Sequence, residues 1–150
     1  MVSVTQIGDV CLTDIYEVQN HMEILYRLLS ERKPHESISH EAMPTFFQHG
    51  VYVTSRPNRH WWFIVDPNNP DYVDVIGILG VTRQNEISIA IAEKHRRKGW
   101  AEKAIKGLLA LYPNIDFLAN INPANDKSIA LFSKFGFKHV QNTYKITHLA

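Results

Sequence analysis

The sequence contains only one cysteine, Cys11, which excludes an internal disulfide and fits a reducing compartment. Nothing close to Cys11 in the sequence would lower the pKa of its thiol, so we interpret this side chain as structural rather than nucleophilic. Long apolar runs are also lacking, since none approaches the roughly 18 residues that suggest a membrane helix, and there is no basic-then-apolar leader. We therefore expect a cytoplasmic protein without a membrane partner.

An excess of charge of one sign is missing as well. The chain has 16 Lys and Arg residues and 15 Asp and Glu residues, which gives a formal net charge of +1. This balance provides no direct evidence for a nucleic-acid partner. The eight histidines form neither an HxxxH nor an HExxH pattern and no cysteine cluster accompanies them, so the sequence predicts no metal site.

The composition is otherwise that of an average globular protein, with 45% hydrophobic and 21% charged residues among 150. A chain of this length can bury one sizeable core but not two. We therefore expect residues 1–150 to form one domain, as a monomer or a homodimer.

The first third of the chain predicts a strand and two helices. Residues 2–13 alternate between apolar and polar side chains, as in a strand. A first amphipathic helix is expected from residue 15 and ends before Pro34, because the residue before a proline avoids the α region. Its apolar positions recur at helical spacing: Ile15, Val18, Met22, Leu25 and Leu29. Pro44 marks the start of a second helix toward Thr54.

The middle of the chain predicts three consecutive antiparallel strands. Residues 60–65 are strongly aromatic and β-branched, and residues 66–71 are rich in turn formers, so residues 60–65 and 72–81 should form a hairpin. Ile87, Ile89 and Ile91 then alternate with smaller or polar residues in a third strand.

The last third predicts a strand, a helix and a closing strand region. Residues 115–121 have the composition of a strand. Asn125 is a plausible N-cap of the following helix, and Gly136 should end it. Residues 138–149 are expected to form one or two closing strands.

A basic loop with a glycine joins the strand at residues 86–91 to a helix that runs to Tyr112. The loop reads Arg96-Arg97-Lys98-Gly99, followed by Trp100 and Ala101. The first amides of a helix have no internal acceptors, and the helix dipole adds partial positive charge there. A strand, a basic glycine loop and a helix together therefore predict a phosphate-binding site.

Two segments resemble the GCN5-related N-acetyltransferase (GNAT) superfamily. Arg96-x-x-Gly99-x-Ala101 resembles its Q/R-x-x-G-x-G/A signature, whose loop holds the pyrophosphate of acetyl-coenzyme A. The segment from Asn125 to Phe137 is similar to the second hallmark, N-x-x-A-x-x-L-Y-x-K-x-G-F. Both lie in the expected order, and together they cover about half of the chain.

This resemblance implies an α/β (α+β) fold with a mixed, mostly antiparallel twisted sheet of about six to seven strands and about four helices. Two central strands would splay apart to admit acetyl-coenzyme A (acetyl-CoA) as the acyl donor. The implied donor-binding residues are Ile89 and Ile91 for the pantetheine arm, Arg96, Arg97, Lys98, Gly99, Trp100 and Ala101 for the pyrophosphate, and Asn125, Ser128 and Phe132 on the second hallmark.

Acetyl transfer to an amine needs a base, a polarised thioester carbonyl and a proton for the leaving thiolate. Glu86 is the candidate base, because histone-acetylating members carry a glutamate near the start of this strand. A backbone amide near Ile91 would hold the carbonyl. Phe132 departs from the family pattern, since many members have a tyrosine there that protonates coenzyme A. Tyr144 or water would supply that proton, or the thiolate would leave unassisted.

The acceptor is expected to be a primary amine of a small molecule, such as a nucleotide-linked amino sugar or a modified nucleobase. Aromatic side chains could form a wall for such a ring or could equally be core: Phe46, Phe47, Tyr52, Trp61 and Trp62. His40 and His60 are further candidates on the acceptor side and alternative bases. The acid-poor middle of the chain argues against a polyamine. A protein N-acetyltransferase and a non-catalytic acyl-CoA-binding module remain alternatives.

Overall fold

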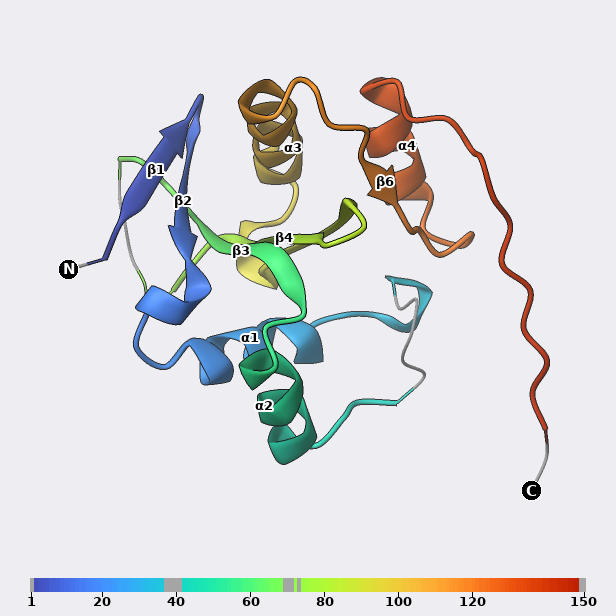
Figure 1. Cartoon of the computed structure of the whole chain (residues 1–150), viewed down its shortest axis with the longest axis horizontal. Helices are drawn as coiled ribbons and strands as arrows, with labels where there is room; N and C mark the ends of the chain where they lie inside the picture. Colours follow the sequence, from blue (N-terminus) through green and yellow to red (C-terminus); the bar gives the residue numbers. More distant parts are fainter. Residues whose placement is uncertain (1, 37–41, 69–71, 73, 149–150) are drawn as a thin grey trace.

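Six strands form one mixed sheet in the order β1-β2-β3-β4-β5-β6 (Figure 1). The structure is a computed structural model that describes residues 2–36, 42–68, 72 and 74–148. The strands are β1 (Val4–Ile7), β2 (Val10–Asp14), β3 (Asn58–Val65), β4 (Gly77–Thr82), β5 (Glu86–Ile91) and β6 (Leu118–Ala119). Neighbouring strands are antiparallel except β5 and β6, which are parallel. The predicted α/β fold with a mixed, mostly antiparallel sheet is confirmed.

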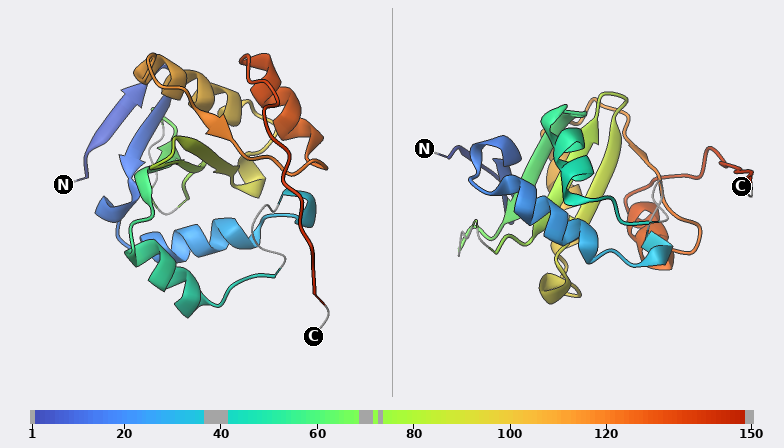
Figure 2. Two further views of the ribbon diagram at one scale, coloured as in Figure 1. Left: turned by 45° about the vertical axis from the view of Figure 1, so that its right-hand side comes forward. Right: turned by 90° about the horizontal axis from the view of Figure 1, so that it is seen from below.

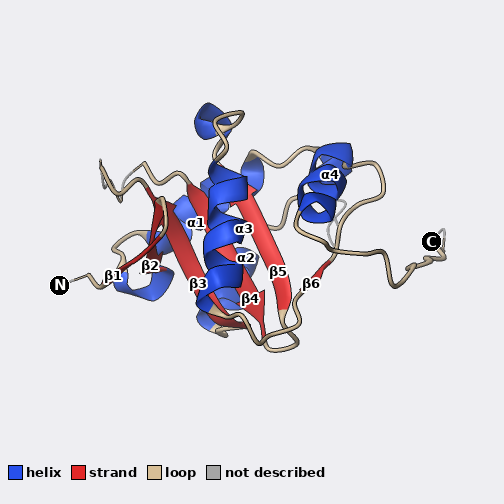
Figure 3. Cartoon of the chain, turned by 90° about the horizontal axis from the view of Figure 1, so that it is seen from above, coloured by secondary structure: helices blue, strands red, loops and turns tan. Residues whose placement is uncertain are grey.

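Four helices of the described chain flank this sheet, as expected. They are α1 (His21–Ser30), α2 (Phe46–Thr54), α3 (Trp100–Leu111) and α4 (Asp126–Lys134). Three short 3-10 turns lie in the connections: η1 (Ile15–Glu17), η2 (Pro34–Glu36) and η3 (Glu93–His95). Helices α1 and α2 cover one face of the sheet and α3 covers the other (Figures 1 and 2). Helix α4 lies beyond the end of the sheet, next to β6 (Figure 3).

The alternation of side chains along the central strands produces a core on each face. Ile87 lies in the cluster under α3 together with Leu79, Ile105 and Leu108. Phe63 is fully buried in the other cluster, under α1 and α2. Because successive strand residues point to opposite faces, each central strand contributes to both cores.

Cys11 belongs to the cluster under α1 and α2 and is buried. Burial raises the pKa of its thiol, with the Asp66 carboxylate adding to the effect. Both effects disfavour the thiolate, which agrees with a structural role for this side chain.

The N-terminal segment differs from the prediction of a single strand and a long helix. Residues 4–14 form a hairpin, in which Ile7 and Val10 flank the two-residue turn. The predicted helix is divided into η1 and α1, because Val18 is extended and Asn20 has a φ of 63°. The apolar spacing continues across this break, which explains why the sequence pattern suggested one helix.

The prediction of closing strands was wrong for the described part of that segment. Residues 138–148 contain no strand, and each of them is exposed. A β-prone sequence forms a strand only where a neighbouring strand accepts its backbone hydrogen bonds, and within the described chain this segment has none. The strand predicted at residues 115–121 is also shorter, since β6 contains only Leu118 and Ala119.

Among the described residues, no helix is both long enough and apolar enough to span a membrane.

Candidate active site

Strands β5 and β6 separate after a short parallel contact. Glu86 pairs with Leu118 and Ile87 pairs with Ala119, and the described residues show no further pairing between the two strands. Beyond Ile87, β5 therefore has an open edge on its β6 side. This divergence confirms the expected splay, although β6 lies at the edge of the six-stranded sheet rather than at its centre.

The backbone groups of β5 alternate in direction along the strand. The amide of Ala92 donates to Ile76 on the β4 side. The carbonyl of Asn85 instead accepts a hydrogen bond from the first residue of β6. Since hydrogen-bonding groups alternate between the two edges of a strand, Ile89 and Ile91 direct their amides toward the open edge. An extended ligand bearing amides could pair with this edge as an added strand.

The start of α3 lies just beyond the end of β5 and has no side-chain cap. Its N-cap is Gly99, and the first helical hydrogen bond runs from the Lys103 amide to the Gly99 carbonyl. The amides of Trp100, Ala101 and Glu102 therefore have no acceptor within the helix. Together with the helix dipole, they form a site suited to an anion such as a pyrophosphate.

Gly99 is required here by its backbone conformation rather than by lack of space. Its φ is 81°, in the left-handed region that other residues rarely adopt, and an added Cβ would meet no atom within 4 Å. Arg97 has a φ of 65° although it is not a glycine. Two left-handed residues within three positions direct the chain from β5 into α3, and left-handed non-glycine residues often occur at functional sites.

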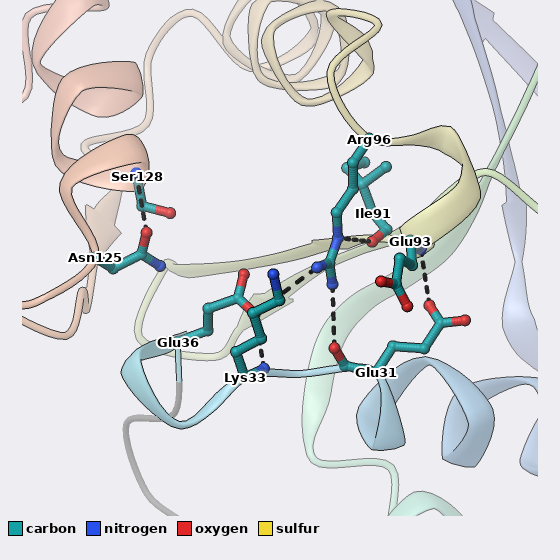
Figure 4. A network of polar contacts seen from close by, with 8 residues as sticks. All are labelled: Glu31, Lys33, Glu36, Ile91, Glu93, Arg96, Asn125 and Ser128. Atoms are coloured by element: carbon teal, nitrogen blue, oxygen red, sulfur yellow. Dashed lines mark hydrogen bonds and ion pairs between the residues drawn. The ribbon is translucent and has the colours of Figure 1, made fainter.

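Arg96 does not point freely toward this anion site. Its Nε donates to the Ile91 carbonyl at 3.0 Å, and one guanidinium nitrogen donates to the Glu31 carbonyl at 3.4 Å (Figure 4). The other terminal nitrogen lies 4.0 Å from the Glu36 carboxylate. Arg96 therefore connects the loop to α1 and η2, whereas the side chains of Arg97 and Lys98 are exposed.

A second set of contacts holds the end of α1 against the end of β5. The Glu93 amide donates to the Glu31 carboxylate at 2.9 Å. Glu36 also accepts from the Lys33 amide at 2.7 Å, which orders η2 next to Arg96 (Figure 4). Three glutamates from separate segments thus gather at the end of the open edge. Sequence reasoning did not find this grouping, because Glu31 is 62 residues from Glu93.

Trp100 lies between the loop and the turns at the far end of the sheet. Lys103 is placed over its ring at 4.7 Å from the centroid. Two hollows of about 420 Å³ and 280 Å³ are both lined by Trp100. Lys98 lines the smaller hollow together with Asp66 and Asp74.

Helix α4 starts on the other side of the open edge, across from η2 (Figure 4). The Asn125 side chain accepts a hydrogen bond from the Ser128 amide at 3.2 Å, so the predicted N-cap is confirmed. Phe132 is buried and contacts Phe137 edge-on at 5.1 Å between ring centroids. Phe132 is thus part of the core, and it cannot donate a proton.

Glu86 lies at the closed end of the opening, where β5 and β6 still pair. Its carboxylate accepts from the Asn120 side chain and lies 3.5 Å from the Thr82 hydroxyl. The Glu86 amide donates to the same hydroxyl at 3.0 Å. Ile89 is three positions after Glu86 in the strand, about 10 Å away, so a proton could pass between a ligand at Ile89 and Glu86 only through water. Asn120 was not singled out by the sequence.

The aromatic residues expected on the acceptor side do not form one wall. Trp61 packs with Tyr16 and Tyr52 on the face of α1 and α2. Trp62 lies on the opposite face, because adjacent strand residues point to opposite sides. Phe46 packs against Tyr26, and Phe47 is 79% exposed.

His60 shares the face of Trp62 and stacks on it at 4.8 Å. The Tyr112 hydroxyl lies 3.3 Å from the His60 Nε2. Burial, and secondarily the Arg59 charge, lowers the pKa of His60. Its contacts fix the end of α3 to β3. His40, the other histidine candidate, lies outside the described residues.

Tyr144 lies in the extended C-terminal segment and is 89% exposed. The structure does not bring it to the open edge of β5 in the same chain.

The GNAT acetyltransferase family model matches residues 22–137 of the chain. No match was found among curated proteins. A solved structure described as a GnaT-family acetyltransferase from Bordetella pertussis is similar, with a TM-score of 0.70 and 18% identity over 94% of this chain and 92% of the other.

The descriptions of two further similar structures name enzymes that act on different acceptors. One is spermidine N-acetyltransferase from Vibrio cholerae in complex with CoA and spermine, with a TM-score of 0.66 and 16% identity over 93% of this chain and 88% of the other. The other is the ribosomal L7/L12 alpha-N-protein acetyltransferase RimL, with a TM-score of 0.63 and 14% identity over 89% and 80%. At these identities, the similarity shows the fold and not the acceptor.

Proposed function

The chain belongs to the GNAT acetyltransferase family and is an acetyl-CoA-dependent N-acetyltransferase, and we propose that its acceptor is a primary amine of a small molecule. The observation that carries this proposal is the set of contacts joining α1 and η2 to the end of β5 through Arg96 and Glu31. These contacts bring a second wall to one end of the opening. A wall on this side suits a small amine, whereas a protein acceptor requires a long open groove.

The residues present fit acetyl-CoA. Its pantetheine arm carries amides, which suit the Ile91 amide and the Ile89 carbonyl on the open edge of β5. Its pyrophosphate suits the uncapped amides at the start of α3, with the exposed Arg97 and Lys98 providing charge. Arg96 contributes by fixing the Ile91 carbonyl and the loop. When bound, acetyl-CoA supplies an acetyl group activated as a thioester.

We assign the polarisation of the thioester carbonyl to the amide of Ile89. This amide points into the opening and lies between the pyrophosphate site and the closed end. A fixed backbone donor stabilises the negative charge that develops on the carbonyl oxygen when the amine attacks. No side chain is needed for this step.

We assign the removal of the amine proton to Glu86, acting through water. An alkyl ammonium has a pKa near about 10.4, so it must lose a proton before it can attack. Asn120 and Thr82 hold the Glu86 carboxylate at the closed end of the opening. As the new C–N bond forms and the C–S bond breaks, the amine proton leaves through the water toward Glu86.

The departing thiolate takes its proton from water in this proposal. Phe132 has no proton to donate, and Tyr144 lies in the exposed C-terminal segment. A thiol has a pKa near about 8.5, so its thiolate is a good leaving group without an acid.

The three glutamates at the end of the opening favour a cationic acceptor. Glu31, Glu36 and Glu93 carry three negative charges, against which Arg96 and Arg32 set two positive charges. The argument against polyamines rested on the scarcity of acidic residues in the middle of the sequence, whereas these glutamates come from separate segments. A ring-bearing acceptor has less support, because Trp61 and Trp62 lie on opposite faces.

A mass-shift screen tests the proposal by offering acetyl-CoA with cationic small amines and, in parallel, with peptides bearing free N-termini or lysines. The expected products are acetylated small amines. Glu86→Gln should lower kcat about 100-fold or more and leave acetyl-CoA affinity unchanged. Glu23→Gln, at an exposed carboxylate near the start of α1, is the matched control. Acetylation of peptides without any acetylated small amine would contradict the proposed acceptor.

We also propose that residues 1–150 form one domain. The family match over residues 22–137 and the single six-stranded sheet support one domain over residues 1–150. The cytoplasmic location stays a prediction.

A further inference from the structure

The connection between β3 and β4 contacts η3, the 3-10 turn that comes just before the basic loop. The Asp74 carboxylate in this connection is paired with the Lys94 ammonium and lies 3.6 Å from the His95 Nε2. The hydrogen bond from Lys94 lowers the pKa of Asp74, so the carboxylate is ionised near neutral pH. The segment Arg96–Gly99, called the donor loop below, begins at the next residue. One carboxylate thus contacts the two residues from which the donor loop starts.

Backbone contacts fix the position of Asp74 relative to the sheet. Val75, the next residue, is fully buried. The Ile76 amide donates to the Ile64 carbonyl at 2.9 Å, and the Ile76 carbonyl accepts from the Ala92 amide at 2.8 Å. Ile76 therefore joins the connection both to β3 and to the end of β5. A carboxylate two positions before Ile76 is well placed to hold η3 at a fixed distance from the sheet.

The space beneath the donor loop is hollow rather than packed. The smaller hollow, of about 280 Å³, is lined by Asp74, His95, Lys98 and Trp100 among others. The Nε2 of His95 is buried and has no hydrogen-bond partner among the described residues. Side chains around a hollow lose packing contacts on one side. The ionic contacts of η3 therefore matter more for the position of the donor loop than they would in a packed core.

The donor loop has a second connection to the rest of the fold, through Arg96. This side chain bonds to two backbone carbonyls near the ends of α1 and β5 (Figure 4). It directly follows His95, so the contacts to Asp74 and to α1 come from successive residues. Both lie before Arg97 and Gly99, whose left-handed conformations direct the chain into α3. A displacement of η3 would therefore move the free amides at the start of α3.

We propose that Asp74 is a positioning residue for acetyl-CoA. By pairing with Lys94 and His95, it holds η3 and the donor loop in the conformation whose amides bind the pyrophosphate. This role rests on the donor site proposed above. Asp74 itself does not contact acetyl-CoA in this role.

The sign of the effect separates positioning from simple electrostatics. Asp74 is negatively charged and lines the same hollow as Lys98 and Trp100, next to a site for an anion. Removing its charge should by itself strengthen the binding of acetyl-CoA. Loss of positioning should instead weaken binding, because the apparent dissociation constant rises as the population of the binding conformation falls. The two explanations therefore predict opposite changes in affinity.

Titration calorimetry of acetyl-CoA with the wild type, Asp74→Asn and Asp74→Glu tests the proposal. Asp74→Asn should weaken binding about three- to fivefold, the range that corresponds to a partly exposed ion pair. Asp74→Glu keeps the carboxylate and should restore most of the affinity. The thermal unfolding temperature should change little in either variant, because the Lys94 side chain is 62% exposed.

Asp66→Asn is the matched control. Asp66 lines the same hollow and would lose the same charge, but it pairs with neither Lys94 nor His95. Its contact with the Asn68 amide can be kept by the oxygen of an asparagine side chain. Asp66→Asn should therefore bind acetyl-CoA as tightly as the wild type, or more tightly.

A double variant identifies the contact through which Asp74 acts. Lys94→Gln should also weaken binding, and Asp74→Asn with Lys94→Gln should match Asp74→Asn alone rather than show the product of the two losses.

Unchanged or tighter binding by Asp74→Asn would overturn the role of Asp74 and leave the donor site in place. Equal losses in Asp74→Asn and Asp66→Asn, or in Asp74→Asn and Asp74→Glu, would overturn it too. A wild type that does not bind acetyl-CoA would overturn the donor site and this role together.

Discussion

Arg96 and Arg97 are adjacent in the sequence, but their side chains have different surroundings. Arg96 is 25% exposed at its side chain and bonds to two carbonyls, those of Ile91 and Glu31. Arg97 is exposed and stands next to the free amides at the start of α3. We therefore assign Arg96 to positioning of the loop and Arg97 to contact with the pyrophosphate.

Two alanine variants separate these roles. Arg96→Ala should lower the free energy of unfolding by about 2 kcal/mol, because it removes charge-assisted hydrogen bonds that join α1 to β5. Arg97→Ala should change stability by no more than about 0.5 kcal/mol, and it should weaken acetyl-CoA binding about tenfold. Denaturant unfolding and titration calorimetry measure the two effects. Equal stability losses in both variants would refute the distinction, and Arg96→Lys should fail to restore the two carbonyl contacts.

His49 is a buried group in α2 whose protonation should affect stability. It is 7% exposed, and its Nε2 has no partner among the described residues. Burial lowers the pKa of His49 from its usual 6.5. Between the lowered folded value and about 6.5, the unfolded chain binds more protons, so the free energy of unfolding falls as pH decreases through this range.

His49→Gln should reduce this pH dependence. One proton changes stability by at most roughly 1.4 kcal/mol per pH unit, so the slope of unfolding free energy against pH below about 6.5 should become shallower in the variant. His60, whose pKa is also lowered, should contribute a second part of the slope. Urea unfolding across the range from about pH 5 to about pH 8 provides the slopes. Identical slopes in the wild type and His49→Gln would show that the pKa of His49 is the same in the folded and unfolded states.

The roles of some residues could be predicted from their neighbours in the sequence, and the roles of others could not. Asn125 and Gly99 were identified because a helix N-cap and a left-handed turn depend on neighbouring residues. The partners of Arg96 could not be identified in this way, because Glu31 lies 65 residues away and meets it only after α1 packs on the sheet. The role of Glu86 was inferred from the family and that of Tyr144 from the departure at Phe132, and both are still predictions.

At the scale of elements, the start of α4 depends on one side chain. Asn125 accepts from the Ser128 amide and occupies the other side of the opening from Arg96. Asn125→Ala should lower the free energy of unfolding by about 1 kcal/mol, whereas Asn125→Asp retains the cap and should be nearly neutral.

The affinity for acetyl-CoA shows whether Asn125 only caps α4 or also contacts acetyl-CoA. If Asn125 also contacts acetyl-CoA, the Asn125→Asp variant should bind it more weakly despite its normal stability, since the new charge faces a phosphate-bearing ligand. Thermal unfolding and titration calorimetry provide both quantities. A weaker affinity only in Asn125→Ala would limit this residue to capping.

Element type was predictable where periodicity and turn residues agreed. The β3-β4-β5 region was predicted as three antiparallel strands, because its alternation is interrupted by dense turn formers, and this is confirmed. The hairpin at residues 4–14 was missed, because a two-residue turn interrupts the alternation only briefly. Residues 138–148 were predicted as one or two strands, but among the described residues they pair with no other strand.

At the scale of the molecule, the separation of β5 and β6 creates the opening. Sequence patterns specify each strand but not the point where two strands diverge, which depends on α3 and α4 packing at different places. This feature was expected only from the family resemblance. Because β5 and β6 separate, the open edge of β5 lies beside the uncapped start of α3. One elongated ligand can contact both.

The most direct test of the account is titration calorimetry of acetyl-CoA with the wild type, Gly99→Glu and Gly136→Glu. Both glycines are left-handed, with φ of 81° and 92°, and neither has an atom within 4 Å of an added Cβ. Each variant therefore bears a similar backbone cost of about 1–2 kcal/mol. Only Gly99→Glu places a carboxylate beside the free amides of α3. The account predicts binding by the wild type and Gly136→Glu and none by Gly99→Glu. Equal binding by all three, or no binding by the wild type, would contradict it.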